Sequence, residues 1–258
     1  MRRSEAGAES LERLGPAIAR HMGVPVAEVE RYYGELVRND EFLGALNDKI
    51  KDVPEFGGKQ FQHVDELRVL RTLLYVVMRI AKPAIVVETG VLHGLGSAFI
   101  LLALEHNQKG TLHSIDLPPS HDDRLLAQGT EALAANQQAG WIIPAGLRSR
   151  HRFHVGRAQE LLPQVLAAEA PVDVFFHDSD HSYTHMMFEM ALGWYHLKPG
   201  GWLIVDNIES NDAFTDFARG VRAEPLEAAS FDTPQRVWKH GLLRANGFYG
   251  DDGSRHGR

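Results

Sequence analysis

The sequence predicts an α/β protein built on a doubly wound, mostly parallel sheet with helices on both faces. From residue 83 onward, short runs rich in β-branched and aromatic residues alternate with longer apolar segments of helical periodicity. A glycine-rich turn follows the first of these runs, and acidic residues follow several later ones. Ligands of such sheets bind beyond the carboxyl ends of the strands, so these turns are where chemistry is expected.

The elements are predicted in order from periodicity and from turn residues. Strands are expected at 84–88, 111–115, 151–155, 172–177 and 201–205. Helices are expected near 97–106, 122–138, 158–168 and 183–196, with a long helix over 64–81 that ends before Pro83. Two β-like segments at 223–230 and 235–240 are expected to close the sheet with a C-terminal antiparallel hairpin.

Three parts are predicted along the chain. Residues 1–62 carry helical periodicity without strand signals and form an N-terminal helical extension, which we expect to act as a lid or a dimer contact. Residues 63–248 form the ligand-binding domain. The polar residues 249–258 are predicted to be a flexible tail.

Composition excludes several classes of function. Cysteine is absent from the 258 residues, which rules out disulfides, thiolate metal sites and a cysteine nucleophile. A net charge of −7 argues against nucleic-acid binding, which needs clustered Lys and Arg. No run approaches the ~20 apolar residues of a membrane helix, and the N-terminus lacks the apolar core of a signal peptide. We therefore expect a cytoplasmic protein that acts on a small molecule. A homodimer is a possible assembly.

The most informative motif is the segment AIVVETGVLHGLGS at 84–97. Glu88 ends the strand, and glycines follow at uneven spacing: Gly90, Gly94 and Gly96. This is not the GxGxxG fingerprint of dinucleotide-binding proteins. An acid so close to the turn would repel a pyrophosphate but attract a sulfonium. The motif therefore predicts S-adenosylmethionine as cofactor rather than NAD.

Further cofactor contacts are predicted from the ends of later strands. Asp116 ends the second strand, where a carboxylate can accept hydrogen bonds from both ribose hydroxyls; its alternative role is to cap a turn before Pro118. After the third strand, the backbone at Ala158 is positioned to meet the adenine. The predicted cofactor-binding residues are Glu88, Gly90, Gly94, Ser97, Asp116, Ala158, Asp178 and Asp180.

Two further segments, FFHDSDHSY and GGWLIVDN, are predicted to bring oxygen ligands together. Asp178 and Asp180 follow the fourth strand, while Asp206 and Asn207 follow the fifth. Neighbouring strands lie ~5 Å apart, so Asp178, Asp206 and Asn207 would present three hard oxygen donors to Mg²⁺ or another divalent cation. The alternative is that these aspartates only cap helices and turns.

With these motifs, residues from about 65 to 240 resemble the class I S-adenosylmethionine-dependent methyltransferases, which have a Rossmann-like fold. Within that class the chain is similar to the divalent-metal O-methyltransferases, including the caffeoyl-coenzyme A and catechol branches and the bacterial enzymes of natural-product and macrolide-sugar tailoring. The resemblance implies metal ligands at Asp178, Asp206 and Asn207. It also implies methylation of a small-molecule hydroxyl, in the setting of secondary-metabolite or antibiotic biosynthesis.

One departure from the family concerns the general base. The catechol and caffeoyl branches carry a lysine three residues after the metal aspartate, and here that position is His181. A neutral histidine can accept a proton at pH 7. His181 and Asp178 are thus the predicted catalytic residues, with metal-bound water as the alternative base and helix capping as the alternative role of His181.

Three other functions stay open at this point. A metal-independent N- or O-methyltransferase would keep the cofactor without the cation. A non-catalytic S-adenosylmethionine-binding protein would keep the cofactor without the reaction. An NAD-dependent oxidoreductase is disfavoured by the glycine spacing and by the lack of a YxxxK pair.

Overall fold

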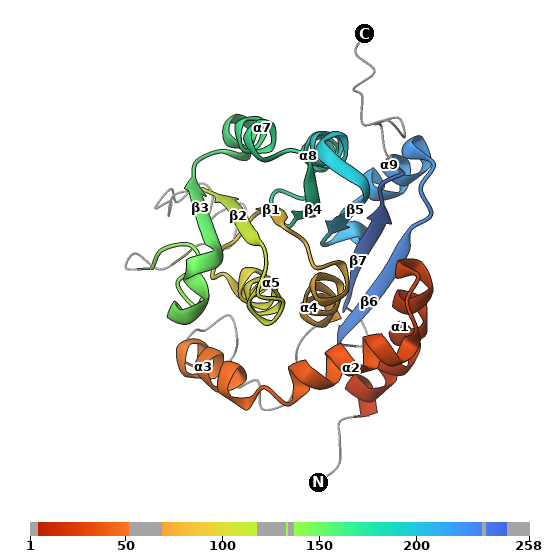
Figure 1. The fold of residues 1–258 in the computed structure, drawn as a ribbon. Helices are drawn as coiled ribbons and strands as arrows, with labels where there is room; N and C mark the ends of the chain where they lie inside the picture. The colour runs from red at the N-terminus through yellow and green to blue at the C-terminus, as the bar shows by residue number, and fades with distance from the viewer. Residues whose placement is uncertain (1–4, 52–68, 118–132, 134–136, 234–235, 247–258) are drawn as a thin grey trace.

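The computed structural model describes residues 5–51, 69–117, 133, 137–233 and 236–246. Its centre is one seven-stranded sheet in the order β3-β2-β1-β4-β5-β7-β6 (Figure 1). The strands are β1 (Ile85–Thr89), β2 (Thr111–Asp116), β3 (His151–Val155), β4 (Val172–His177), β5 (Leu197–Val205), β6 (Leu226–Thr233) and β7 (Arg236–Arg244). The first five run parallel, and β7 is antiparallel to both of its neighbours.

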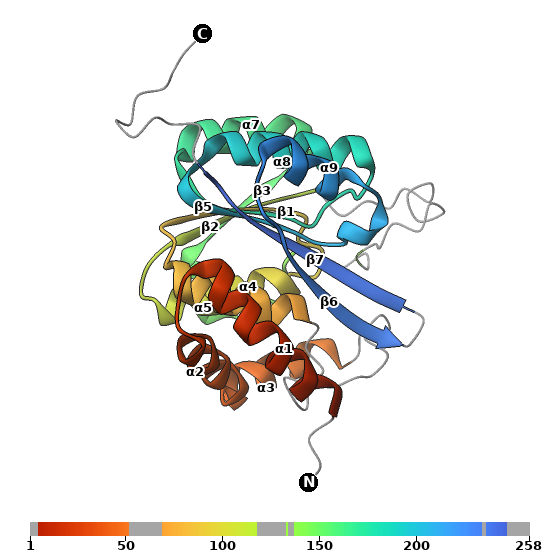
Figure 2. The same cartoon turned by 90° about the vertical axis from the view of Figure 1, so that its right-hand side faces the viewer.

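Helices cover both faces of the sheet (Figure 2). One face carries α4 (Val69–Ala81) and α5 (Leu95–His106), with α1 (Glu5–Met22) against β6 and with α2 (Val26–Val37) and α3 (Asp40–Ile50) in an outer layer. The other face carries α7 (Ala158–Glu169), α8 (Tyr183–His196) and α9 (Ala213–Val221). Two short 3₁₀ helices complete the described chain, η3 (Ala145–Arg150) and η4 (Ile208–Ser210).

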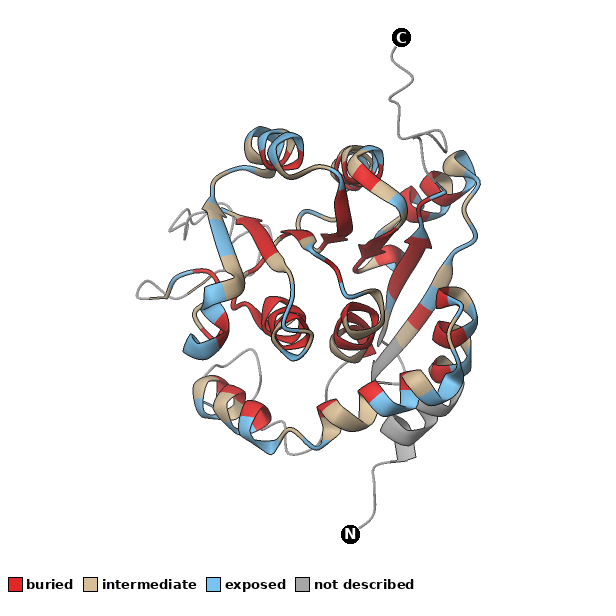
Figure 3. Ribbon diagram, viewed as in Figure 1, coloured by how far each residue is buried: buried red, intermediate tan, exposed pale blue. Residues whose placement is uncertain are grey.

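The central strands are buried on both sides (Figure 3). Every residue of β4 is buried, as expected for a parallel strand with helices above and below. Helix α5 is apolar around most of its circumference, because the sheet, α4 and η3 all pack against it. Phe42 of α3 meets Phe99 of α5 edge to face, with the ring centroids 5.1 Å apart.

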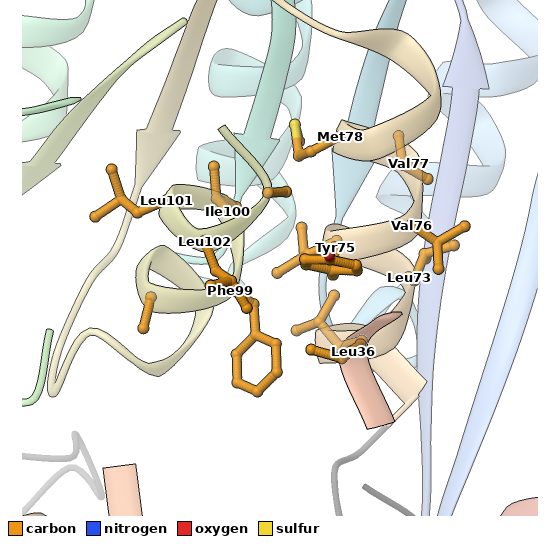
Figure 4. Close-up of a cluster of buried hydrophobic side chains, with 14 of the residues drawn as sticks. Leu36, Leu73, Tyr75, Val76, Val77, Met78, Phe99, Ile100, Leu101 and Leu102 are labelled. Atoms are coloured by element: carbon orange, nitrogen blue, oxygen red, sulfur yellow. The ribbon is translucent and has the colours of Figure 1, made fainter. Parts of the chain in front are cut away.

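The N-terminal helices share this core rather than forming a separate body. Leu36 of α2 packs among the side chains of α4 and α5, including Leu73 and Phe99 (Figure 4). The Arg79 guanidinium of α4 forms an ion pair with Glu35 of α2 at 2.9 Å. The described part of the predicted extension is therefore integral to the hydrophobic core.

The predicted fold class is confirmed, including the C-terminal antiparallel hairpin. Helix α8 has the predicted bounds, whereas β5 starts four residues earlier than predicted, because Leu197 already pairs with Val172 of β4. The helix predicted near 122–138 lies almost wholly outside the described residues, as does the tail 249–258. No helix among the described residues combines the length and apolar character needed to cross a bilayer.

Candidate active site

The site lies where three neighbouring parallel strands end. The register pairs Thr89 of β1 with His177 of β4, and His177 with Val205 of β5. Backbone hydrogen bonds continue past these ends, from the Asp178 amide to the Thr89 carbonyl and from the Asp206 amide to the His177 carbonyl, both at 2.9 Å. The residues that follow the three strands are therefore held side by side.

Two glycines of the turn after β1 are required by close backbone contacts. Gly90 has φ +81°, and a Cβ there would lie 1.9 Å from the Asp178 carbonyl oxygen. Gly94 has φ +91° at the N-terminus of α5, and a Cβ there would lie 2.6 Å from the Cα of Gly140. Gly96 has neither constraint, since its nearest neighbour would be at 3.5 Å. Gly90 thus joins the glycine loop (residues 90–94) directly to the loop after β4.

Glu88 lies beneath the glycine loop. Its side chain is buried and its Oε2 accepts hydrogen bonds from Ser97 and Ser114, both at 2.7 Å. Burial raises the pKa of Glu88, and the hydrogen bonds from the two serine hydroxyls lower it. Burial has the larger effect, and the resulting pKa is about 7. Because the Ser97 hydroxyl points to this carboxyl group, Glu88 and Ser97 both support the glycine loop from below. That either residue contacts the cofactor stays a prediction.

Asp116 holds the glycine loop from the end of β2. Its Oδ2 accepts hydrogen bonds from the amides of Val91 and Leu92, at 2.9 and 2.7 Å, and its Oδ1 accepts one from the Leu117 amide. The Asp116 carbonyl accepts from Gly156, two residues before Ala158 at the start of α7. Asp116 and Ala158 therefore lie at the same edge of the sheet as the glycine loop.

Asp178, Asp206 and Asn207 are brought together as predicted. Asp178 and Asp206 share a side-chain hydrogen bond. Burial and the charge of Asp206 raise the pKa of Asp178 well above its ordinary value. Asn207 adopts a left-handed conformation, φ 52°, which asparagine tolerates better than most residues. The Asn207 amide group, oriented to donate, reaches the Asp206 carboxylate at 2.8 Å.

His240 of β7 is a member of this cluster that the sequence analysis missed. Its Nδ1 is hydrogen-bonded to Oδ1 of Asp206. Burial acts to raise the pKa of Asp206, but the hydrogen bond and charge of His240 outweigh it and lower that pKa. The cluster therefore contains one carboxyl that retains its proton more readily than usual and one that loses it more readily.

His181 begins the turn into α8, beside this cluster. Its Nε2 lies 3.9 Å from Oδ1 of Asp178, and its ring meets that of His177 with the centroids 5.4 Å apart. Burial and the neighbouring His177 lower the pKa of His181, so the ring is neutral at pH 7. Asp180, by contrast, is exposed and its Oδ1 accepts from the Ser182 amide at the start of α8.

A second buried residue missed by the sequence analysis is Glu189 of α8. Its carboxylate accepts hydrogen bonds from Thr89 and His177 at 2.5 Å, from His185 at 2.7 Å and from Ser179 at 2.9 Å. Burial would raise the pKa of Glu189, but the hydrogen bonds from His177 and His185 lower it to about 2. Glu189 therefore ties the ends of β1 and β4 to α8. A lone acid in the apolar run MMFEMAL is the signal that could have found it.

The two histidines that bind Glu189, His177 and His185, have supporting roles. His185 is bound to Glu189 and to Gln159, which agrees with a supporting rather than a metal-ligating role. His177 is half satisfied: its Nδ1 is bound to Glu189, whereas its Nε2 has no partner within the described part of the chain. In that same part, no three His, Cys, Asp or Glu side chains gather closely enough to form a metal site of their own.

Comparison with known proteins identifies the fold. Residues 87–208, from β1 to η4, match the model of a family described as a methyltransferase domain. This confirms the predicted S-adenosylmethionine-dependent methyltransferase, resembling the O-methyltransferases. No curated protein sequence matches the chain significantly.

Solved structures share the fold of this methyltransferase at low sequence identity. The O-methyltransferase TomG from Streptomyces achromogenes, involved in tomaymycin synthesis and solved with S-adenosylmethionine, is 19% identical with a TM-score of 0.56. That match covers 82% of this chain and 92% of TomG. An O-methyltransferase from Bacillus cereus, in complex with S-adenosylhomocysteine, is 14% identical with a TM-score of 0.54, covering 84% of this chain and 97% of that one. A putative O-methyltransferase from Klebsiella pneumoniae is 15% identical with a TM-score of 0.54, covering 86% and 97%.

Proposed function

We propose that this methyltransferase transfers the methyl group of S-adenosylmethionine to a hydroxyl oxygen of a small molecule, assisted by Mg²⁺ or another divalent cation. The observation that carries the proposal is the contact between Gly90 and the backbone of Asp178. It sets the glycine loop against the first of the oxygen-bearing side chains. A methyl donor on that loop and an acceptor at the carboxylates would therefore be neighbours, as direct transfer requires.

The cofactor is expected to bind along the glycine loop. Oδ2 of Asp116 already accepts from two loop amides, whereas Oδ1 accepts only from the Leu117 amide. Oδ1 therefore has a lone pair left that can accept from a ribose hydroxyl. Ala158 at the start of α7 is the proposed neighbour of the adenine. Glu88, one layer below, would support the loop through Ser97 and Ser114 rather than contact the cofactor.

The donor set fits a hard dication. Asp178, Asp206 and Asn207 carry oxygens and meet beyond two adjacent strands. Two ionised carboxylates this close repel each other, and burial together with the charge of Asp206 raises the pKa of Asp178. A cation held there would relieve that repulsion and lower the pKa of an acceptor hydroxyl. The same three side chains would then fix where the acceptor lies relative to the glycine loop.

His181 is the proposed base. Neutral at pH 7, it can accept the hydroxyl proton on a ring nitrogen as the new O–C bond forms and the S–C bond breaks, which leaves S-adenosylhomocysteine. Asn211 donates to the His181 carbonyl at 2.8 Å and so holds the backbone from which the ring projects. Asp178, 3.9 Å from His181, is the alternative proton acceptor.

A metal-independent methyltransferase is the second candidate. The observation in its favour is the bond between His240 and Asp206, which already supplies this carboxylate with a partner within the chain. A protein that binds S-adenosylmethionine without turnover is the remaining alternative. A role in natural-product biosynthesis is supported by the likeness to TomG, and a cytoplasmic location and homodimerisation stay predictions.

Binding measurements test the proposal before the acceptor is known. By isothermal titration the wild-type protein should bind S-adenosylhomocysteine, and by electron paramagnetic resonance it should bind one Mn²⁺. Asp206→Ala should abolish Mn²⁺ binding and keep S-adenosylhomocysteine binding, whereas Asp116→Ala should do the reverse. Failure of the wild type to bind S-adenosylhomocysteine overturns the proposal, and binding without any Mn²⁺ site selects the metal-independent candidate.

A further inference from the structure

The segment 139–143 packs directly on the glycine loop. The Gly140 amide donates to the Leu92 carbonyl at 2.8 Å, and the Ile142 amide donates to the His93 carbonyl at 3.2 Å. The indole Nε1 of Trp141 donates to Nδ1 of His93 at 2.8 Å. Three hydrogen bonds thus join this segment to two consecutive residues of the loop.

The N-terminal helix α3 holds the same segment from the opposite side. Lys49 donates from Nζ to the carbonyl of Trp141 at 3.0 Å and to that of Ile143 at 3.5 Å. The Arg148 guanidinium donates to the Gly140 carbonyl at 2.8 Å. Partial burial, together with the charge of Arg148, lowers the pKa of Lys49. The segment is therefore fixed by two cations bonded to its backbone.

The glycine loop needs such support because one of its residues has an unfavourable backbone conformation. Leu92 has φ +48°, in the left-handed region that leucine seldom occupies. Two hydrogen bonds stabilise this conformation: its amide donates to Asp116 and its carbonyl accepts from Gly140. One of the two therefore comes from the segment that Lys49 holds.

We propose that Lys49 is a positioning residue for the cofactor: by fixing segment 139–143, it holds the glycine loop in the conformation that binds S-adenosylmethionine. The inference rests on the proposed function, because it takes the loop to be the cofactor-binding element. It also gives the N-terminal helices a role besides those of lid or dimer contact. Through α3, the N-terminal helices set the affinity for S-adenosylmethionine of a glycine loop that lies some forty residues further along the chain.

The test compares variants of the full chain in their affinity for S-adenosylhomocysteine. Lys49→Met keeps the apolar stem and removes the donors, so the dissociation constant from isothermal titration should rise about tenfold. Hydrogen exchange at the Gly140 and Ile142 amides should quicken in the same variant. Lys49→Arg should restore most of the affinity, and Lys51→Met, an exposed lysine two residues away, should behave as wild type.

Other outcomes would overturn the inference. If Lys49→Met lowers the melting temperature but leaves the dissociation constant and the two amides unchanged, Lys49 is only structural. Should that variant fail to fold, Trp141→Phe tests the contact between the segment and the glycine loop. This variant removes the hydrogen bond to His93 and keeps the backbone carbonyl that Lys49 contacts, so it should also weaken S-adenosylhomocysteine binding. Unchanged affinity of Trp141→Phe rejects the inference. A wild-type protein that does not bind S-adenosylhomocysteine rejects the proposed function instead.

Discussion

Gly90 and Gly96 belong to one motif, yet the structure requires glycine only at Gly90. The sequence alone does not separate them, because the pattern gives spacing and not the conformation of each glycine. The positive φ of Gly90 and the nearby Asp178 carbonyl both exclude a side chain, whereas Gly96 lies in the first turn of α5 with room for a methyl group.

Gly90→Ala should therefore destabilise the fold by about 2 kcal/mol or more and weaken S-adenosylhomocysteine binding. Gly96→Ala is the matched control. Its free energy of unfolding should stay within about 1 kcal/mol of wild type, because alanine is favoured in helices. Chemical denaturation and isothermal titration measure both effects. Equal losses in the two variants would contradict this account of the loop.

Glu88 makes stability depend on pH. Its folded pKa of about 7 exceeds the ordinary 4.5, so between these values the folded protein keeps a proton that the unfolded chain releases. The free energy of unfolding therefore falls by about 3 kcal/mol as the pH rises from 4.5 to 7, because of Glu88 alone. Glu88→Gln does not titrate and should gain about that much over wild type between pH 4 and pH 8, as measured by urea unfolding. Parallel pH curves for the two proteins would show that Glu88 is ionised in the fold.

At the scale of elements, the hairpin β6–β7 completes the site as well as the sheet. His240 reaches Asp206 because β7 pairs with β5 just before that strand ends, with Gly241 opposite Val205. The sequence predicts the hairpin but not this contact, since the pairing register of residues 34 apart in the chain cannot be inferred from local patterns.

His240→Gln should weaken Mn²⁺ binding 10- to 100-fold, because partners of metal-ligating carboxylates orient the ligand. Electron paramagnetic resonance at fixed pH gives the dissociation constant. His196→Gln, a partly buried histidine at the end of α8, serves as the control and should not change it. Unaltered Mn²⁺ affinity in His240→Gln would remove His240 from the metal site.

Contacts that follow from the place of each residue in its own segment could be predicted from the sequence, whereas contacts that depend on how distant segments pack could not. Asp178, Asp206 and Asn207 were predicted to meet because each directly follows a strand, and parallel strands end at one edge. Glu189 and Lys49 were missed because their partners lie on other elements: Glu189 reaches across to β1, and Lys49 reaches from α3 to the backbone of segment 139–143. A side chain that binds distant backbone leaves no pattern in its own segment.

At the scale of the whole molecule, the sheet and the helices around it form one body in which the site depends on both ends of the chain. The N-terminal helices share the core of α4 and α5 and contact the segment that packs on the glycine loop. The C-terminal hairpin supplies His240. The extension predicted as a separate part is thus continuous with the methyltransferase domain in the described residues.

A crystal structure of the full chain with S-adenosylhomocysteine and Mn²⁺ would show whether the cofactor and the cation bind side by side at the ends of β1, β4 and β5. We expect an anomalous Mn²⁺ peak at about 2.2 Å from oxygens of Asp178 and Asp206, beside a cofactor that lies along the glycine loop. Density for the cofactor elsewhere, or a Mn²⁺ peak away from these two carboxylates, would contradict it.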